Sequence, residues 1–133
     1  MAACQCGAVT VTVADDVAIT DVNVCHCQAC QRRTGSPFGM IAWVPATAVT
    51  VRGTVTAFTR KADSGRDFTN RFCPVCGSSI LFEAPLKPGV IGIAAGAFAD
   101  PHFPPPVRSV WEESRHAWVA LPESAARFER GRG

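Results

Sequence analysis

Residues 25–30 read Cys25-His26-Cys27-Gln28-Ala29-Cys30, which places three thiols within six residues. Three convergent thiolates can hold a metal ion in three of its four tetrahedral positions, and zinc is the ion that sulfur-rich tetrahedral sites favour. Sites closed by four protein ligands are usually structural, whereas sites with three ligands and an open position are usually catalytic. This stretch therefore predicts a zinc site with an open position, and the rest of the chain is expected to form the scaffold that holds the metal sites.

The other four of the seven cysteines form a complete ligand set of their own. Cys4 and Cys6 lie near the start of the chain, and Cys73 and Cys76 form a C-x-x-C-G knuckle far from them in sequence. We expect a closed, structural zinc on these four residues, which would contribute folding free energy directly. A redox-active C-x-x-C pair is the alternative, and the lack of a βαβ pattern around Cys73 disfavours it.

Three interpretations of Cys25, Cys27 and Cys30 remain open at this point. The first is a zinc with an open or exogenous fourth ligand. The second is a site closed by His26 or by a remote histidine, and the third is a set of unmetallated or redox cysteines. Because His26 lies between two ligand residues, we expect its ring to point away from their common ion. An ordinary, partly exposed imidazole is the default expectation for His26, His102 and His116.

The surroundings of the three cysteines favour a thiol over water as the ligand of an open zinc. Water activation generally needs a neighbouring carboxylate base, and zinc deaminases carry H-x-E. No carboxylate lies just before Cys25 or within ten residues after Cys30, and the nearest is Asp21. A zinc-bound thiol, by contrast, is deprotonated without a base. Arg32 and Arg33 follow the site and could hold a substrate carboxylate, or they could be solvated surface charges.

The composition is that of one globular domain spanning residues 1–133. The chain is 47% hydrophobic and 18% charged, and its net charge of +2 is too small to indicate a nucleic-acid or membrane partner. We expect no secretory signal, and the longest apolar run, residues 90–99, is about half of the roughly 20 residues that a membrane-spanning helix needs. Clustered cysteines in a cytoplasmic protein indicate metal or redox chemistry more than disulfides.

Short alternating or apolar segments separated by turn residues predict a mainly β, antiparallel fold. The expected strands are residues 8–13, 17–24, 38–44, 54–60, 67–72, 79–83, 90–97 and 107–111. The second should pair with the first as a hairpin around Asp15-Asp16. Residues 31–37 predict a short helical turn broken by Gly35 and Pro37. Residues 62–66 and 85–89 predict loops, and the proline-rich residues 100–106 predict an extended connection. Residues 123–130 are a candidate short helix, and residues 123–133 are a possible frayed tail.

Three motifs resemble those of the glutathione-dependent formaldehyde-activating enzymes, a family grouped with centromere protein V. They are Cys4-x-Cys6-Gly7-x-Val9, Cys25-His26-Cys27-x-x-Cys30-x-Arg32-x-x-Gly35-Ser36-x-Phe38 and Phe72-Cys73-x-x-Cys76-Gly77-Ser78, and Trp118-Val119 is similar to the family's C-terminal tryptophan. The resemblance covers nearly the whole chain, and its combined cysteine pattern is specific. The Pro104-Pro105-Pro106 stretch departs from the family pattern.

The resemblance implies a β-tent of coiled antiparallel sheets and two zinc ions per chain. It implies a structural zinc on Cys4, Cys6, Cys73 and Cys76 and a catalytic zinc on Cys25, Cys27 and Cys30. The implied activity is that of a carbon–sulfur lyase that adds glutathione, or another small thiol, to formaldehyde or a related aldehyde. Candidate substrate-binding residues are Arg32, Arg33, Gly35 and Ser36. The alternative is a non-catalytic, zinc-stabilised binding or scaffold module, which we expect to carry a long basic or proline-rich extension that these 133 residues lack.

Overall fold

Two β-sheets make up most of the computed structural model, which describes residues 1–62, 64–85 and 88–131. The smaller sheet has the order β1-β2-β5, with β1 at Ala2–Ala3, β2 at Thr10–Val13 and β5 at Val49–Arg52. The larger sheet has the order β11-β10-β3-β4-β9-β8-β7-β6. Its strands are β3 (Asp21–Cys25), β4 (Gly39–Pro45), β6 (Thr56–Lys61), β7 (Asp67–Phe72), β8 (Ser79–Glu83), β9 (Val90–Ala94), β10 (Arg108–Val110) and β11 (Ala126–Arg127). The predicted mainly β class is confirmed.

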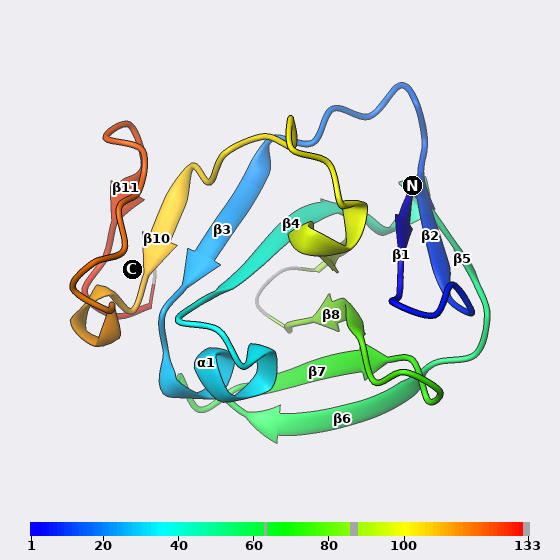
Figure 1. Cartoon of the computed structure of the whole chain (residues 1–133), viewed down its shortest axis with the longest axis horizontal. Coiled ribbons are helices and arrows are strands. Elements are labelled where there is room, and N and C mark those ends of the chain that lie inside the picture. The colour runs from blue at the N-terminus through cyan, green and yellow to red at the C-terminus, as the bar shows by residue number, and fades with distance from the viewer. Residues whose placement is uncertain (63, 86–87, 132–133) are drawn as a thin grey trace.

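The small sheet and the β10–β11 pair lie on opposite sides of the molecule, and the long sheet curves between them (Figure 1). One apolar cluster joins the two sheets, and it includes Val11 of β2, Val9 just before that strand, and Val44, Ile80 and Ile93 from the large sheet. Burial of these aliphatic side chains is the main apolar contribution to stability at this junction. A second, smaller cluster of Ile41, Trp43 and Phe82 lies within the large sheet.

The only α-helix among the described residues is α1 (Gln28–Thr34), and three short 3₁₀ segments are η1 (Ala46–Ala48), η2 (Ala95–Phe98) and η3 (Glu112–Ser114). Gly35 ends α1 in the left-handed conformation, with φ of 67°, and its N–H donates to the carbonyl of Gln31. The predicted break at Gly35 is therefore present, but the helix begins three residues earlier than expected and carries Cys30. No helix in the described part of the chain is long and apolar enough to cross a membrane.

The predicted hairpin between residues 8–13 and 17–24 is wrong. β2 pairs with β1 and β5, whereas β3 pairs antiparallel with β4 and parallel with β10. The N–H of Ala14, which a hairpin turn would have used, donates to the carbonyl of Ala48. An alternating apolar pattern determines which face of a strand is buried, but it does not determine the neighbouring strand.

The chain after residue 122 is neither a helix nor a frayed tail as far as residue 131. β11 pairs parallel with β10, and the N–H of Trp111 donates to the carbonyl of Arg130. The edge of β10 would otherwise leave backbone donors and acceptors unpaired, and this requirement prevails over the weak helical preference of residues 123–130. The pairs β3–β10 and β10–β11 are parallel. The other seven strand pairs are antiparallel.

Parts of the turn, loop and tail predictions fall on residues 63, 86–87 and 132–133, which lie outside the described residues.

Strand boundaries in the middle of the chain follow the sequence closely. β7 and β8 have the predicted bounds, and β6 begins two residues later than expected. The apolar run from Val90 forms β9 only as far as Ala94, after which η2 turns the chain away. Gly92 lies where β9 passes Ile41 and Trp43, since a Cβ there would come within 2.7 Å of Ile41 Cγ2.

Candidate metal centres

The four-sulfur cluster consists of Cys4, Cys6, Cys73 and Cys76, whose Sγ atoms all lie within 4.8 Å of one another. Cys6 Sγ is 3.7 Å from the Sγ atoms of both Cys4 and Cys73. Four sulfurs bound to one zinc at about 2.3 Å in a tetrahedron are about 3.8 Å apart. The four-sulfur cluster therefore has the donor type and the spacing to hold one metal ion such as zinc.

Glycines and backbone amides shape the loops that carry these sulfurs. Gly7 and Gly77 have φ of 80° and 79°, in the left-handed region where a residue with a Cβ is strained. They turn the chain back immediately after Cys6 and Cys76. The amides that point at sulfur in the two loops are Val9 N to Cys4 Sγ at 3.2 Å and Val75 N to Cys73 Sγ at 3.4 Å.

Ser78 links the two halves of the four-sulfur cluster. Its Oγ lies 3.3 Å from Cys76 Sγ and accepts a hydrogen bond of 3.1 Å from the backbone N–H of Gln5. The hydrogen bond with Ser78 is the largest cause that lowers the pKa of Cys76 to about 5. A thiolate at Cys76 is the form that binds a metal ion.

The three-sulfur cluster consists of Cys25, Cys27 and Cys30, whose Sγ atoms also lie within 4.8 Å of one another. Cys25 ends β3, Cys27 caps α1 and accepts a hydrogen bond from the N–H of Cys30, and Cys30 lies in the first turn of α1. Among the described residues, no fourth histidine, cysteine, aspartate or glutamate joins this group. This observation disfavours a site closed by His26 or another histidine.

Charge within the three-sulfur cluster is concentrated on one sulfur. Hydrogen bonds from the thiols of Cys25 and Cys30 lower the pKa of Cys27 to about 2, although burial opposes the change. The same contacts raise the pKa of Cys25 far above its usual range. Three thiolates can coexist here only with a cation among them, which is the condition that a bound metal ion meets.

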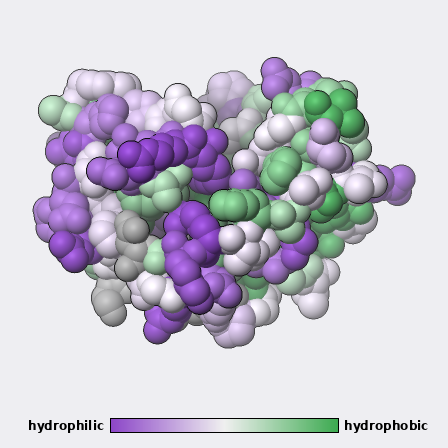
Figure 2. All heavy atoms as spheres, turned by 90° about the horizontal axis from the view of Figure 1, so that it is seen from below, coloured by the Kyte–Doolittle hydropathy of each residue, from purple (hydrophilic) through white to green (hydrophobic). Residues whose placement is uncertain are grey.

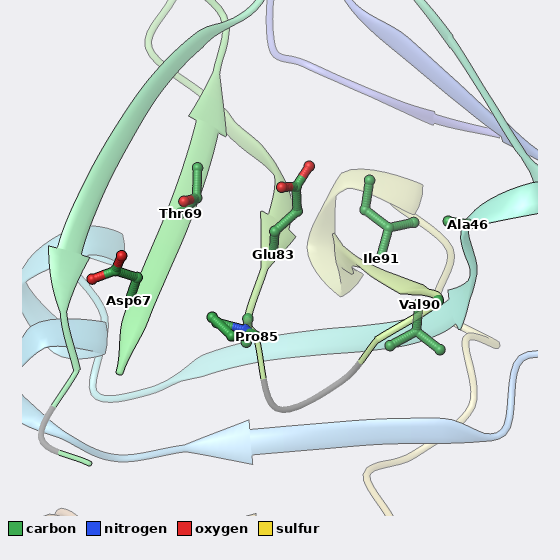
Figure 3. Close-up of a pocket in the computed structure, with 9 residues that line it drawn as sticks. Ala46, Asp67, Thr69, Glu83, Pro85, Val90 and Ile91 are labelled. Atoms are coloured by element: carbon green, nitrogen blue, oxygen red, sulfur yellow. The ribbon is translucent and has the colours of Figure 1, made fainter. Parts of the chain in front are cut away.

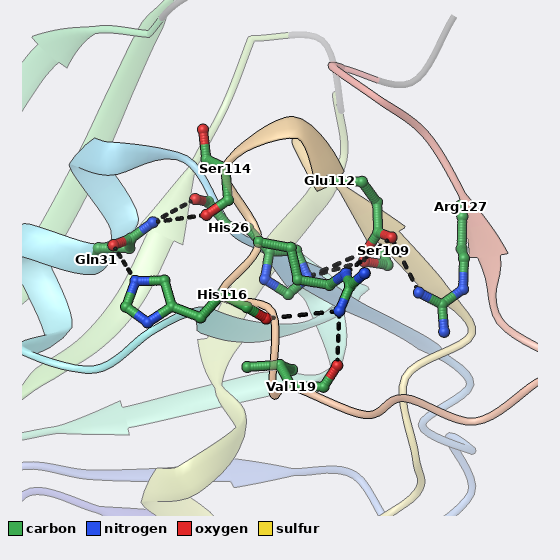
Figure 4. A network of polar contacts seen from close by, with 9 residues as sticks. His26, Gln31, Ser109, Glu112, Ser114, His116, Val119 and Arg127 are labelled. Atoms are coloured by element: carbon green, nitrogen blue, oxygen red, sulfur yellow. Dashed lines mark hydrogen bonds and ion pairs between the residues drawn. The ribbon is translucent and has the colours of Figure 1, made fainter.

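His26 is fully buried, so the expectation of a partly exposed imidazole is wrong for this residue. Its Nε2 lies 2.9 Å from Ser109 Oγ and 3.4 Å from a carboxylate oxygen of Glu112 (Figure 4). Ser109 donates its hydroxyl hydrogen to Glu112, so its oxygen is free to accept the N–H of His26 Nε2. The other ring nitrogen, Nδ1, is buried without a hydrogen-bond partner among the described residues. Burial lowers the pKa of His26, and the nearby Glu112 only partly opposes this change, which favours the neutral ring.

Glu112 is the carboxylate that local sequence reasoning missed. It is 10% exposed and also pairs with Arg127 Nη1 at 2.9 Å and with Arg115 Nε at 3.3 Å. Burial alone would raise the pKa of Glu112, but the hydrogen bonds from Ser109 and Arg127 outweigh it and hold the pKa below its ordinary value. A carboxylate with a low pKa is a weak general base. No local motif could have revealed this contact, because Glu112 is far from His26 in sequence.

A second set of contacts ties α1 to the chain that follows β10. Gln31 Nε2 donates to the carbonyls of His26 and Ser114, at 2.8 and 3.2 Å, and Gln31 Oε1 lies 3.0 Å from His116 Nε2 (Figure 4). The three-sulfur cluster is thus positioned by residues from the C-terminal part of the chain. His102 is exposed and its backbone N–H bonds to Asp100.

The four candidate substrate-binding residues divide into two pairs. Arg32 is exposed, whereas the guanidinium of Arg33 lies 4.5 Å from the centroid of the buried Phe82 ring. Gly35 ends α1, and the N–H of Ser36 donates to Thr34 Oγ1. Gly35 and Ser36 line none of the clefts found beside α1, whereas Arg33 lines the two largest of them, and Arg32 lines the smaller of those two.

The two largest of these clefts meet at Arg33. One, of about 530 Å³, lies between α1 and the strands β6 and β7, and Arg32, Phe58, Arg60, Phe68 and Asn70 contribute to its lining. The other, of about 810 Å³, runs toward Cys4 of the four-sulfur cluster. On the face seen from below in Figure 2, hydrophilic side chains gather over the left and centre, whereas apolar side chains gather toward the right.

Another pocket, of about 430 Å³, is lined by residues of β7 and by residues at the end of β8 and the start of β9 (Figure 3). Its acidic residues, Asp67 and Glu83, are paired with Lys61 at 2.9 Å and with Arg71 at 3.1 Å. No cysteine lines this pocket, so we assign no chemistry to it.

Comparison with known proteins gives a family for the chain. The family model for "Glutathione-dependent formaldehyde-activating enzyme" matches residues 1–114, a range that includes all seven cysteines. The chain belongs to this family. A crystal structure of a Rhodobacter sphaeroides protein matches with a TM-score of 0.58 over 96% of this chain and 97% of that one, and its 19% identity makes the likeness one of fold. The search of curated proteins found no match. The family resemblance predicted from the cysteine motifs is confirmed, although Trp118-Val119 lies beyond the matched residues.

Proposed function

We propose that this protein is a zinc-dependent carbon–sulfur lyase that joins glutathione, or another small thiol, to formaldehyde or a related aldehyde. The observation that carries the proposal is the three-sulfur cluster, in which Cys27 and Cys30 are buried and Cys25 is half-buried, and which no fourth histidine, cysteine, aspartate or glutamate of the described residues completes. Membership of the formaldehyde-activating family supports the substrate pair. Because reduced thiols are required as ligands and as substrate, we place the protein in the cytoplasm as part of this proposal.

The cysteines divide the work between two ions in this proposal. Cys4, Cys6, Cys73 and Cys76 would hold a structural zinc, and Cys25, Cys27 and Cys30 would hold the catalytic one. When bound, the second zinc would supply a fourth position at which a substrate sulfur is kept as its thiolate. The chain contributes the rigid end of β3 and the first turn of α1, which together fix the three ligands.

The bond changes are those of an addition to an aldehyde. The substrate sulfur forms a bond to the carbonyl carbon, the C=O electron pair moves to oxygen, and that oxygen takes up a proton equivalent to the one that the thiol released. Arg32 and Arg33 would bind the substrate, whereas Gly35 and Ser36 would act indirectly by shaping the end of α1. The low pKa of Glu112 favours thiol addition over water activation, because its carboxylate is a weak base.

Exchange NMR of labelled formaldehyde with glutathione tests this proposal, since free and thiol-bound formaldehyde give separate signals. We expect the zinc-loaded protein to accelerate exchange between these signals, and Cys27→Ser to abolish the acceleration while its far-UV circular dichroism remains native. Absence of acceleration across several thiols and aldehydes would instead favour a zinc-stabilised binding module.

A further inference from the structure

Arg33 presents hydrogen-bond donors that no group in the described chain accepts. Its Nε and Nη2 atoms are both buried and both without a partner. These two nitrogens form the edge of the guanidinium whose parallel N–H groups bind a carboxylate through two hydrogen bonds. Arg33 as a whole is half-buried, but buried N–H groups without an acceptor destabilise a protein, so this arrangement is typical of a group that acquires its partner from outside.

The position of this guanidinium is fixed by its neighbours. It stacks over Phe82, which is fully buried in the large sheet. On another side it lies against Gly39, where an added Cβ would come within 2.5 Å of Arg33 Nη2. A donor pair held in place before binding costs less conformational entropy when its ligand arrives.

The same space adjoins the three-sulfur cluster. The Cβ position at Gly39 lies 3.4 Å from Cys30 Cβ as well, and Gly39 is the register partner of Cys25 in the β3–β4 pair. Arg33 and the cysteines therefore border one short stretch of β4. A small molecule whose sulfur lies at the three-sulfur cluster could therefore place an anionic group against Arg33.

The cleft between α1 and the strands β6 and β7 offers a second unfilled polar group. Asn70 Oδ1 is buried without a hydrogen-bond partner among the described residues, and Asn70 and Arg33 line the same cleft. Phe58 and Phe68 supply apolar walls, and Arg60 adds positive charge. Unpaired donors and an unpaired acceptor in one cleft match a ligand that carries both a carboxylate and an N–H group.

We propose that Arg33 binds the carboxylate of the thiol substrate through Nε and Nη2, and that Asn70 accepts an N–H of the same molecule. The inference rests on the proposed function for the presence of a thiol and narrows its class to acylated amino-acid or peptide thiols. It also separates the two adjacent arginines, because Arg32 is exposed and its charge is screened by solvent.

The test is a calorimetric titration of the zinc-loaded protein, without aldehyde, with N-acetylcysteine and with N-acetylcysteinamide. In the second ligand a neutral carboxamide replaces the carboxylate of the first. We expect the wild-type protein to bind the acid at least tenfold more tightly than the amide, and Arg33→Gln to bind the two within threefold of each other. Any effect of sulfhydryl pKa cancels, because both proteins are measured with the same two ligands. Arg52→Gln removes an exposed positive charge on β5 and should keep the wild-type ratio.

Two further measurements separate ligand binding from a structural role of Arg33. Ligand-free Arg33→Gln should melt at or above the wild-type temperature and retain the zinc content of the wild type. Loss of zinc from this variant, a wild-type acid-to-amide ratio in this variant, or failure of the wild type to bind or distinguish the acid would each overturn the inference. Failure of the proposed reaction would appear separately, as absence of formaldehyde exchange with the binding ratio intact.

Discussion

The two cysteine clusters are built from different kinds of sequence. The four-sulfur cluster joins Cys4 and Cys6 to a knuckle that follows β7, so one group closes a loop through much of the chain. The three-sulfur cluster draws all its ligands from residues 25–30. An ion that joins remote segments stabilises the fold, because the unfolded chain has no such site. An ion on a local segment closes almost no loop, so it should contribute less to the stability of the fold.

Their supports differ in the same way. Backbone amides and two left-handed glycines shape the four-sulfur cluster locally. The three-sulfur cluster depends instead on the side chains of Ser109 and His116 and the carbonyl of Ser114, which contact His26 and Gln31 from the far end of the chain. We infer that the first cluster is a fold-determining unit and that the second is positioned by the fold after it forms.

The largest expected difference is between Cys73→Ser and Cys27→Ser. Cys73 is fully buried in the apolar cluster that joins the two sheets, so its loss should leave the protein unfolded or aggregated. Cys27→Ser should give a folded protein with one zinc ion per chain in place of two. Circular dichroism and metal analysis of anaerobically purified protein measure both outcomes. Equal structural damage from the two substitutions would show that the clusters are equivalent.

Graded removal of metal should separate the clusters next. With increasing chelator, we expect one zinc to leave first together with the exchange activity, while the melting temperature changes little. The second should leave at concentrations at least tenfold higher and together with the folded structure, because a fourth protein sulfur must be released. Simultaneous loss of both ions would contradict the distinction, and Cys27→Ser, which lacks the first step, is the matched control.

The sequence predicts the local features of both clusters and misses what reaches them from a distance. Ligand spacing, the turns at Gly7 and Gly77 and the bounds of β7 and β8 all follow from short-range patterns, and the structure has them. The predicted pairing partner of β3, the strand that ends at Cys25, was wrong, because an alternating apolar pattern is compatible with any neighbouring strand. The burial of His26 and its contact with Glu112 depend on that same unpredicted β3–β10 pairing.

Glu112→Gln tests the remote support of the three-sulfur cluster. It keeps the size of a side chain that is 10% exposed, but it removes the charge that pairs with Arg115 and Arg127. We expect the free energy of unfolding to fall by about 1–3 kcal/mol at pH 7, which is the usual cost of leaving buried partners without a charged acceptor. The structural zinc should stay bound, which metal analysis can verify.

The stability difference between the wild type and Glu112→Gln should depend on pH in a defined direction. Because the folded-state pKa of Glu112 lies below its ordinary value of 4.5, the wild-type advantage should be complete above that pH and decline as the pH falls through the folded-state pKa. Acid also protonates the cysteines, but this affects both proteins and cancels in their difference. Urea titrations at several pH values would measure it, and a difference that grows on acidification would contradict the assignment.

The smallest expected effect concerns Ser78, the side chain that links the halves of the four-sulfur cluster. Ser78→Ala removes the contact with Cys76 Sγ and the bond from Gln5 N, for a loss of about 0.5–1.5 kcal/mol in stability. Without Ser78, the pKa of Cys76 should rise from about 5 toward its ordinary value of 9.0, so protons compete better for this sulfur. The pH at which the structural zinc is released should therefore increase, whereas Ser124→Ala, an exposed control, should not change it. The zinc of the three-sulfur cluster does not contact Ser78, so it should be released at the same pH in Ser78→Ala and in Ser124→Ala. If Ser78→Ala shifted the release of both zinc ions equally, the two clusters would be coupled.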